Sequence, residues 1–410
     1  MTTKNSRPWI DPPRLPTTHY IDNRIFTDPE IFAAEQARIF AGNWKLVCHE
    51  SEMPNPGDFR VSNVAGRSLV SVRGKDGGIR SFYNVCPHRG AELVREPRGN
   101  ISRGFQCFYH HWTFDLEGQC TGLTRPAAYE RFGPKPEDVG LRHVRTQLVH
   151  GLVFISLNDD VPSAETYLGG LMPILKEHLG AEELEVFHHH SAVIKSNWKL
   201  WNDNNAELYH VFLHVFNRKT SLNQPDFYKA RWHMFENGHA YLEQRSVNYK
   251  KGGLDGRDQN LLPGMKPAGS LVVGIFPDVM VNIRATAMRI DTITPLSPGE
   301  TLVEWRGLGL KSDSDEVRAM RIQHHNQVWG PAGKNLAEDI EAIETQWRNM
   351  AHGASRYSII AREEDMQAQC DSSLRSFYQE WGRRVGRWPH DADAQRELSI
   401  VTDGGQRVHG

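Results

Sequence analysis

Two cysteine–histidine pairs lie close together in the first third of the chain. Cys86 and His88 belong to Cys-Pro-His-Arg-Gly, and Cys107 and His110 belong to Cys-Phe-Tyr-His-His-Trp. Two thiolates and two imidazoles can hold one structural zinc ion in a tetrahedral site. The same four ligands can hold a Rieske [2Fe–2S] cluster, with both cysteines on one iron and both histidines on the other.

The residues around these pairs favour the cluster over zinc. Each motif supplies one cysteine and one histidine, as expected of two loops that grip a two-iron cluster from opposite sides. Arg89, Tyr109 and Trp112 could shield a buried redox centre and hydrogen-bond to it, which helps to set its potential. Unrelated cysteines and histidines are a poor explanation, because both pairs fall within residues 86–110.

A second possible metal site lies downstream, where three residues separate His210 from His214. The surrounding stretch, residues 197–216, is predicted to be one helix. On a helix this spacing puts both imidazoles on the same face, one turn apart. Two histidines and one carboxylate, with open positions, form an oxygen-activating iron site. Taken alone, such a pair is more often structural than metal-binding.

Both cysteine–histidine motifs, and the run from Asn197-Trp-Lys to Glu207-Leu-Tyr-His210, resemble the α subunits of Rieske non-haem iron ring-hydroxylating oxygenases. The likeness covers residues 29–350 and is greatest to the branch that oxidises aromatic acids such as terephthalate, anthranilate and salicylate. It implies a Rieske [2Fe–2S] cluster and a separate mononuclear Fe(II) in each subunit.

The resemblance also assigns roles to single residues. It implies that His210 and His214 bind the mononuclear iron together with a distal carboxylate, for which Asp339 is the match. Glu207 stands where the family carries an acidic residue that links the cluster of one subunit to the iron of its neighbour. The local alternatives to the carboxylate ligand are Glu338, Glu341 and Glu344.

Three positions depart from the family's pattern. His111 stands where a small residue, most often glycine, is usual. Many relatives place four residues between the two iron-binding histidines, whereas this chain places three. Glu207 replaces the aspartate of most relatives and is longer by one methylene. None of these changes removes a ligand.

The resemblance implies an α+β protein with two main domains. An N-terminal arm and helix, residues 1–43, would pack on the catalytic domain. Residues 44–160 would form an all-β Rieske domain, which short strands and glycine-rich turns also indicate. Residues 161–410 would form an α+β, helix-grip (START-like) catalytic domain whose antiparallel sheet wraps a long helix.

Several elements of this plan follow from the residues alone. Asp28-Pro-Glu is typical of a helix start, so a helix is expected over 29–41. Residues 271–293 and 301–310 alternate like strands, and a helical stretch from Val317 to Met350 has a possible break at Gly330-Pro331.

One predicted strand offers a possible substrate contact. Asn282 and Arg284 share a face, and an arginine there could clamp a carboxylate or sulfonate through two hydrogen bonds. An exposed strand residue or a structural ion pair explains Arg284 at least as well. The substrate is therefore expected to be an anionic aromatic compound only as a hypothesis.

By resemblance, a reductase takes electrons from NAD(P)H and passes them to the cluster, directly or through a ferredoxin. The enzyme would form a head-to-tail homotrimer, or an α3β3 assembly with a small β subunit, and would hydroxylate its substrate with O2. A monooxygenase or demethylase acting on a non-aromatic or amine substrate would use the same iron centres. A Rieske electron carrier and a zinc-bound module are alternatives from other classes.

Composition excludes several other classes. The 410 residues carry a net charge of −2 with acidic and basic residues mixed along the chain, so no nucleic-acid partner is expected. No apolar run approaches the ~20 residues that cross a bilayer, and no membrane association is expected. Five cysteines are too few for a disulfide framework in a chain of this length. A cytoplasmic location is the expectation.

Overall fold

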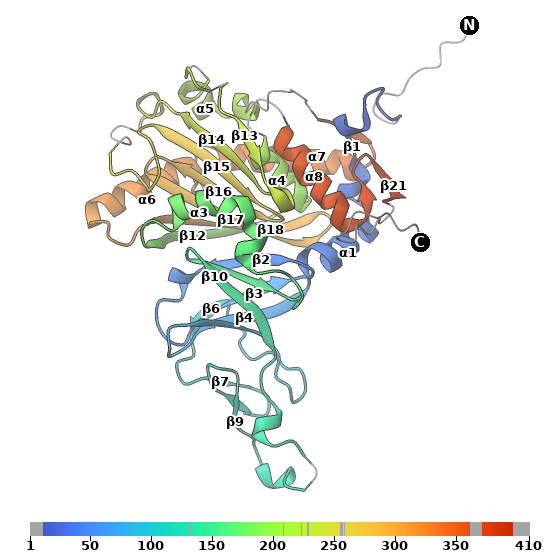
Figure 1. The fold of residues 1–410 in the computed structure, drawn as a ribbon, viewed down its shortest axis with the longest axis vertical. Coiled ribbons are helices and arrows are strands. Elements are labelled where there is room, and N and C mark those ends of the chain that lie inside the picture. The colour runs from blue at the N-terminus through green and yellow to red at the C-terminus, as the bar shows by residue number, and fades with distance from the viewer. Residues whose placement is uncertain are drawn as a thin grey trace, which may run out of the picture.

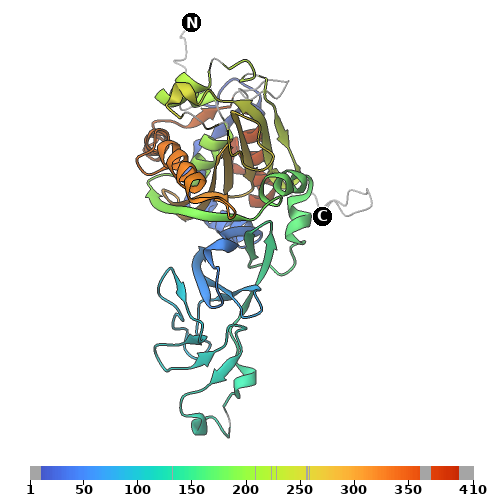
Figure 2. The same ribbon diagram turned by 90° about the vertical axis from the view of Figure 1, so that its left-hand side faces the viewer.

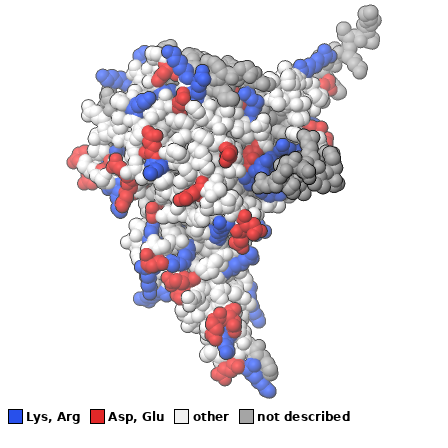
Figure 3. All heavy atoms as spheres, in the orientation of Figure 1, with Lys and Arg blue, Asp and Glu red and all other residues white. Residues whose placement is uncertain are grey.

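The computed structural model describes residues 11–396, except 132, 208, 223, 228, 255, 256, 258 and 361–370. A narrow β domain extends from a broader domain of helices around an antiparallel sheet (Figure 1). Among the described residues, no helix is long and apolar enough to span a membrane. Acidic and basic side chains are interspersed on the face shown in Figure 3.

The N-terminal helix begins where the sequence predicts. The Asp28 carboxylate accepts the backbone N–H of Glu30 at 2.8 Å and so caps α1 (Pro29–Glu35). A π-helical turn, Gln36–Phe40, continues it to almost the predicted end. The apolar side chains of this segment pack into the core of the larger domain, not into the β domain: Ile31, Ile39 and Phe40.

The β domain contains two antiparallel sheets. The larger has the strand order β2-β11-β10-β5-β4-β3-β6, and the smaller the order β7-β8-β9. The strands of the larger sheet are β2 (Trp44–His49), β3 (Asp58–Val64), β4 (Arg67–Arg73), β5 (Ile79–Tyr83), β6 (Arg98–Asn100), β10 (His143–Val149) and β11 (Leu152–Ser156). Those of the smaller sheet are β7 (Phe105–Gln106), β8 (Thr113–Phe114) and β9 (Cys120–Gly122).

A seven-stranded antiparallel sheet organises the larger domain, in the order β12-β18-β17-β16-β15-β14-β13. Its strands are β12 (Leu184–Ile194), β13 (Trp232–Met234), β14 (Ala240–Ser246), β15 (Gly269–Ile275), β16 (Val279–Arg284), β17 (Ala287–Ser297) and β18 (Glu300–Leu310). The remaining helices are α2 (Ala164–Leu168), α3 (Met172–Leu179), α4 (Trp198–Ala206), α5 (Val215–Thr220), α6 (Asp315–Trp329), α7 (Leu336–Ala351) and α8 (Ser372–Val385). Two short pairs complete the fold: β1 (Tyr20–Asp22) with β19 (Tyr357–Ile359), and β20 (Arg387–Trp388) with β21 (Asp391–Gln395).

The two faces of this sheet have different partners. Side chains alternate along a strand, so Val281 and Ile283 of β16 pack with α2 and α3 in one apolar core. Asn282 and Arg284 point to the opposite face, where they contact α4 and α5. Figure 2 shows helices on both sides of the sheet, with α6 in orange and the green helices α2 and α3 on opposite sides.

Most of the predicted elements are present, but one helix is wrong. The stretch predicted as strands forms β15 to β18, and the long helical stretch divides into α6 and α7 around Gly330. The helix predicted over 197–216 ends instead at Ala206. Glu207 is extended, and its carboxylate accepts the backbone N–H groups of Tyr209 and His210 at 3.0 and 3.3 Å. These side-chain hydrogen bonds compete with the helix and stop it.

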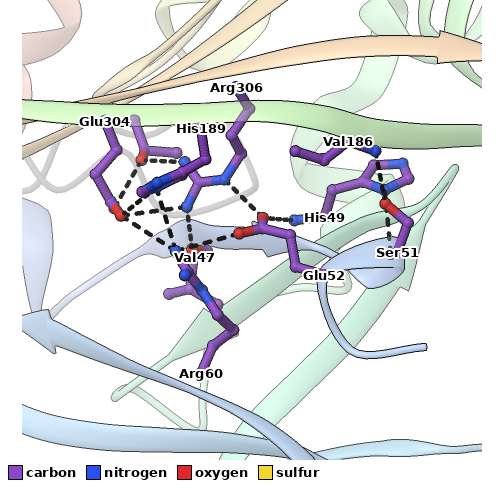
Figure 4. Close-up of polar contacts among 10 residues, drawn as sticks. Val47, His49, Ser51, Glu52, Arg60, Val186, His189, Glu304 and Arg306 are labelled. Atoms are coloured by element: carbon purple, nitrogen blue, oxygen red, sulfur yellow. Dashed lines mark hydrogen bonds and ion pairs between the residues drawn. The ribbon is translucent and has the colours of Figure 1, made fainter. Parts of the chain in front are cut away.

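A buried polar network, the interdomain joint, connects the two domains (Figure 4). Arg306 on β18 donates from Nε to Glu52 of the β domain at 2.6 Å and from Nη2 to the carbonyl of Val47 at 3.2 Å. Arg60 lies 3.1 Å from the same carboxylate. Burial alone would raise the pKa of Glu52, but the charges of Arg306 and Arg60 outweigh burial and lower it. Further contacts of the joint pair Arg60 with Glu304 at 3.3 Å, Glu304 with His189, and Ser51 with Val186.

Candidate active site and metal centres

The two cysteine–histidine motifs meet at the outer end of the β domain, in the loops that follow β5 and β7. Cys86 and Cys107 are 2% and 1% exposed, and burial, together with the neighbouring Cys107 thiol, raises the pKa of Cys86. The Nδ1 atoms of His88 and His110 are 3.1 Å apart. The indole of Trp112 stacks on His88, with ring centroids 4.5 Å apart.

This donor set fits a two-iron cluster better than one zinc ion. A tetrahedral zinc site gathers all four ligand atoms at about 2.0–2.3 Å from a single point. Among the described residues, the two cysteine–histidine motifs do not bring three ligand atoms within 4.8 Å of one another. The only described group that does so is His210, His214 and Asp339. Two buried sulfurs and two adjacent imidazole nitrogens instead match the separate irons of a Rieske cluster.

The backbone explains why His111 is unusual for the family. Its φ is +55°, in the left-handed region that glycine adopts without strain. Histidine is among the side chains found there more often than most. The exposed imidazole extends outward while its backbone N–H bonds to the carbonyl of Cys107 at 2.9 Å. The loop keeps its turn despite the larger side chain.

The structure brings the three expected iron ligands together. Asp339 Oδ1 lies 3.1 Å from His214 Nε2 and 3.6 Å from His210 Nε2. Asp339 is in the first turn of α7, and His214 is the residue before α5. His210 lies in a 3-10 turn, Tyr209–Phe212, so the two histidines do not share one helix face as predicted. They converge through the path of the chain between α4 and α5.

The outer nitrogens of both imidazoles are held by carboxylates. His210 Nδ1 is 2.7 Å from Glu207 Oε1, and His214 Nδ1 is 2.7 Å from Glu338 Oε2. Each carboxylate fixes the tautomer that leaves Nε2 free to bind a metal, and makes that nitrogen more basic. Both Nε2 atoms point toward Asp339, so the site is preorganised for a 2-His-1-carboxylate metal.

The two imidazoles differ in their access to solvent. The His210 side chain is 20% exposed and that of His214 2% exposed. Burial lowers the pKa of His210, but the hydrogen bond and charge of Glu207 and the charge of Asp339 outweigh it and give a net rise. The open side of the site is therefore at His210.

Arg284 and Asn282 lie on the sheet face that looks toward this site. Arg284 is 7% exposed and donates from Nη2 to Asn217 at 3.3 Å, with its guanidinium over the ring of Trp329. Arg284 is buried, so it is not an exposed strand residue, and it forms no ion pair with a described residue. Asn282 Nδ2 is 3.5 Å from Asn205 Oδ1.

Sequence reasoning missed three side chains of this region. Glu338 was considered only as an alternative iron ligand, whereas it contacts the outer nitrogen of His214. Asn204 donates to Asp339 Oδ1 at 3.2 Å. Arg245 lies on the same face of the sheet as Arg284, with β15 between them. No sequence pattern marks these three, because each depends on the packing of distant segments.

Comparison with known proteins agrees with this geometry. The family description "Rieske [2Fe-2S] domain" matches residues 43–133, and "Ring hydroxylating alpha subunit (catalytic domain)" matches residues 181–386. The chain is 42% identical to the 2-aminobenzenesulfonate 2,3-dioxygenase subunit alpha of Alcaligenes sp over 391 residues, covering 94% of this chain and 98% of that protein. It is 38% identical to the methanesulfonate monooxygenase hydroxylase subunit alpha of Methylosulfonomonas methylovora, covering 96% and 97%.

The fold is that of a solved oxygenase structure. The naphthalene 1,2-dioxygenase from Rhodococcus sp. bound to indole superposes with a TM-score of 0.76 at 22% identity, covering 89% of this chain and 94% of that chain. The predicted α+β class and the two iron cofactors are confirmed by the family matches, and the readings as a zinc-bound module or a simple electron carrier are wrong. The chain belongs to the α subunits of the Rieske non-haem iron ring-hydroxylating oxygenases.

Proposed function

We propose that this α subunit is the terminal oxygenase that hydroxylates an anionic aromatic substrate with O2. The observation that carries the proposal is the preorganised triad of His210, His214 and Asp339, together with a buried arginine, Arg284, whose Nη1 has no partner among the described residues. NAD(P)H supplies the electrons through a reductase, with or without a ferredoxin.

The residues divide the work between two metal centres. Cys86, His88, Cys107 and His110 hold the cluster, and His210, His214 and Asp339 hold the iron. Bound Fe(II) supplies the activation of O2. Glu207 and Glu338 keep the imidazoles oriented, and the exposed edge of His210 leaves the approach to the centre open.

We also propose that three α subunits form a head-to-tail ring, with or without a small β subunit. Figure 1 supports this, because β7 and β9 lie at the end of the molecule farthest from α4 and α5. Exposed apolar side chains lie beside each centre, Phe108 and Tyr109 near the cluster and Phe212 and Leu213 near the triad. A heterologous contact between these surfaces would bring His110 toward the neighbour's Glu207.

The substrate class rests on relatives and on Arg284. The relatives at 42% and 38% identity are named for sulfonates, one aromatic and one aliphatic. Their shared group is the anion, which Arg284 can clamp from the buried face of β16 with Asn282 beside it. The second relative favours one further candidate, monooxygenation of a small aliphatic sulfonate.

Two further expectations stay proposals. The domain limits are 1–43, 44–160 and 161–410, and the location is cytoplasmic.

The first test is an EPR spectrum of anaerobically purified, dithionite-reduced protein, with iron and zinc counted on the same sample. We expect the rhombic, low-average-g signal of a His-ligated cluster and about three irons per chain, two of them in the cluster. Bound zinc without this signal would overturn the proposal. Turnover of a benzoate-type substrate and of its amide by Arg284→Gln then tests the clamp, because equal losses on both would remove it.

A further inference from the structure

A second buried arginine lies beside Arg284. Arg245 of β14 pairs with Ser270 of β15, which pairs in turn with Arg284 of β16. Residues paired across strands project from the same face of a sheet. Neighbouring strands are about 4.8 Å apart, so the two arginine backbones are about 10 Å apart with only the short Ser270 side chain between them. Two guanidinium groups can converge on one small group across that gap.

Both arginines have hydrogen-bonding groups without a protein partner. Arg245 and Arg284 are each 7% exposed. Nε and Nη1 of Arg245 and Nη1 of Arg284 have no hydrogen-bond acceptor among the described residues. Buried donors are normally satisfied, and an unpaired buried charge is costly. Three unsatisfied guanidinium nitrogens on one face therefore point to a missing acceptor.

A neighbouring arginine shows how this sheet satisfies a buried cation. Arg289 of β17 is bound by Asp291 through two hydrogen bonds of 2.7 Å each. No described carboxylate accepts a hydrogen bond from Arg245: the charge of Asp226 acts on it, but Asp226 accepts from Ser246 through Oδ2, and its Oδ1 has no described partner. No described acidic group lies within 4.0 Å of either guanidinium of the Arg245–Arg284 pair.

The two buried cations act on each other electrostatically. Burial, followed by the charge of Arg284, lowers the pKa of Arg245 to about 9. The charge of Asp339 acts on Arg284, but that carboxylate also faces the iron site. The charge of Arg245 reaches His210 as well. Asn205 of α4 contacts Asn282, and its neighbour Asn204 donates to Asp339, so the sheet face that carries Arg284 lies beside the triad.

We propose that Arg245 and Arg284 together form the binding site for the substrate's anionic group, and that this group is a sulfonate. The inference rests on the proposed function and adds Arg245 and the headgroup to it. A carboxylate has two oxygens in one plane, which suit a single guanidinium. A sulfonate presents three oxygens in a pyramid and accepts from two guanidiniums at once. The rest of the substrate then extends from the sheet toward His210.

Binding to the iron-loaded, anaerobic enzyme tests the inference without turnover. Benzenesulfonate, methanesulfonate, benzoate and the neutral benzenesulfonamide are titrated by calorimetry into wild type, Arg245→Gln, Arg284→Gln and Arg245→Lys. Arg231→Gln is the matched control, because it removes an exposed arginine near the edge of the same sheet. Iron content, the EPR signal and the melting temperature are recorded for every sample.

We expect wild type to bind at least one sulfonate, and to bind benzenesulfonate about tenfold or more tighter than benzoate or the sulfonamide. Arg245→Gln and Arg284→Gln should each weaken sulfonate binding by about 10- to 100-fold, as loss of hydrogen bonds to a charged group does. Arg245→Lys should recover part of the loss, and Arg231→Gln should bind like wild type.

Three results would overturn the inference. In the first, the wild-type enzyme binds neither sulfonate. In the second, benzoate binds as tightly as benzenesulfonate. In the third, Arg245→Gln has normal iron content and melting temperature and keeps full sulfonate affinity. Failure of the proposed function has a different signature, since it removes the iron and EPR signals from wild type but leaves an arginine-dependent sulfonate affinity measurable.

Discussion

The contact between Glu338 and His214 predicts how tightly the iron site holds its metal. Glu338 Oε2 lies 2.7 Å from the outer nitrogen of His214, while Asp339, the next residue on α7, faces the inner nitrogen. The substitution Glu338→Gln keeps the size of the side chain and removes its charge. It should therefore weaken the metal site without displacing a ligand.

The expected size of the effect follows from exposure. Loss of such an outer carboxylate costs about 10- to 100-fold in metal affinity, or about 1.4–2.7 kcal/mol. The Glu338 side chain is 35% exposed and that of Glu207 15% exposed. Water screens the charge of the more exposed carboxylate better. We therefore expect Fe(II) affinity to fall about tenfold in Glu338→Gln and by a larger factor in Glu207→Gln. The assay is Fe(II) affinity, measured anaerobically by competition with a coloured chelator.

Two more variants make the result decisive. Glu341→Gln removes an exposed charge from the same helix and should leave Fe(II) affinity within about twofold of wild type. Asp339→Asn removes the expected ligand and should abolish stoichiometric binding. If Glu338→Gln binds like the Glu341→Gln control, the outer contact has no effect on the metal. If Glu338→Gln abolishes binding and Asp339→Asn does not, Glu338 is the ligand and the assignment is reversed.

Three further predictions concern stability. Glu52→Gln removes the carboxylate that pairs with both Arg306 and Arg60 and leaves Glu304 as their remaining partner. Urea titration should therefore show a loss of about 3 kcal/mol, and a loss below about 1 kcal/mol would contradict this. Burial lowers the pKa of His239 from 6.5 to about 4. Below about pH 6.5 the unfolded chain therefore binds more protons than the folded chain. Stability should then decrease by about 2 kcal/mol between pH 7 and pH 5 from this side chain, and His239→Gln should remove that share unless the imidazole titrates normally. Arg245→Met removes a buried cation that has no ion pair with a described residue. The substrate-free melting temperature should therefore rise by a few degrees, and a clear fall in calorimetry would refute this.

The sequence revealed the cluster motif because its geometry is local. Each loop carries a cysteine and a histidine two or three residues apart, so spacing alone brings Cys86 near His88 and Cys107 near His110. The distal carboxylate is different. Only likeness to a known family pointed to Asp339, since α7 reaches the histidines through tertiary packing.

Other features could not be predicted because they depend on competition or on register. Periodicity favoured a helix through residue 216, but the Glu207 carboxylate binds backbone N–H groups that the helix needs. Arg245 and Arg284 lie in one row on the same face only because β14, β15 and β16 pair in one particular register. A shift by one residue would send either side chain to the opposite face.

The break between α4 and α5 bears on how this family diversifies. Along an uninterrupted α-helix each residue rotates the chain by about 100°, so deleting one residue between two ligands would turn the second away from the metal. Here His210 lies in a separate turn and His214 precedes α5. A deletion therefore shortens a connecting loop and leaves the orientation of α5 free to adjust. A chain with one more residue between the histidines can therefore keep the same metal geometry, because the added residue would lengthen a connection and not rotate a helix.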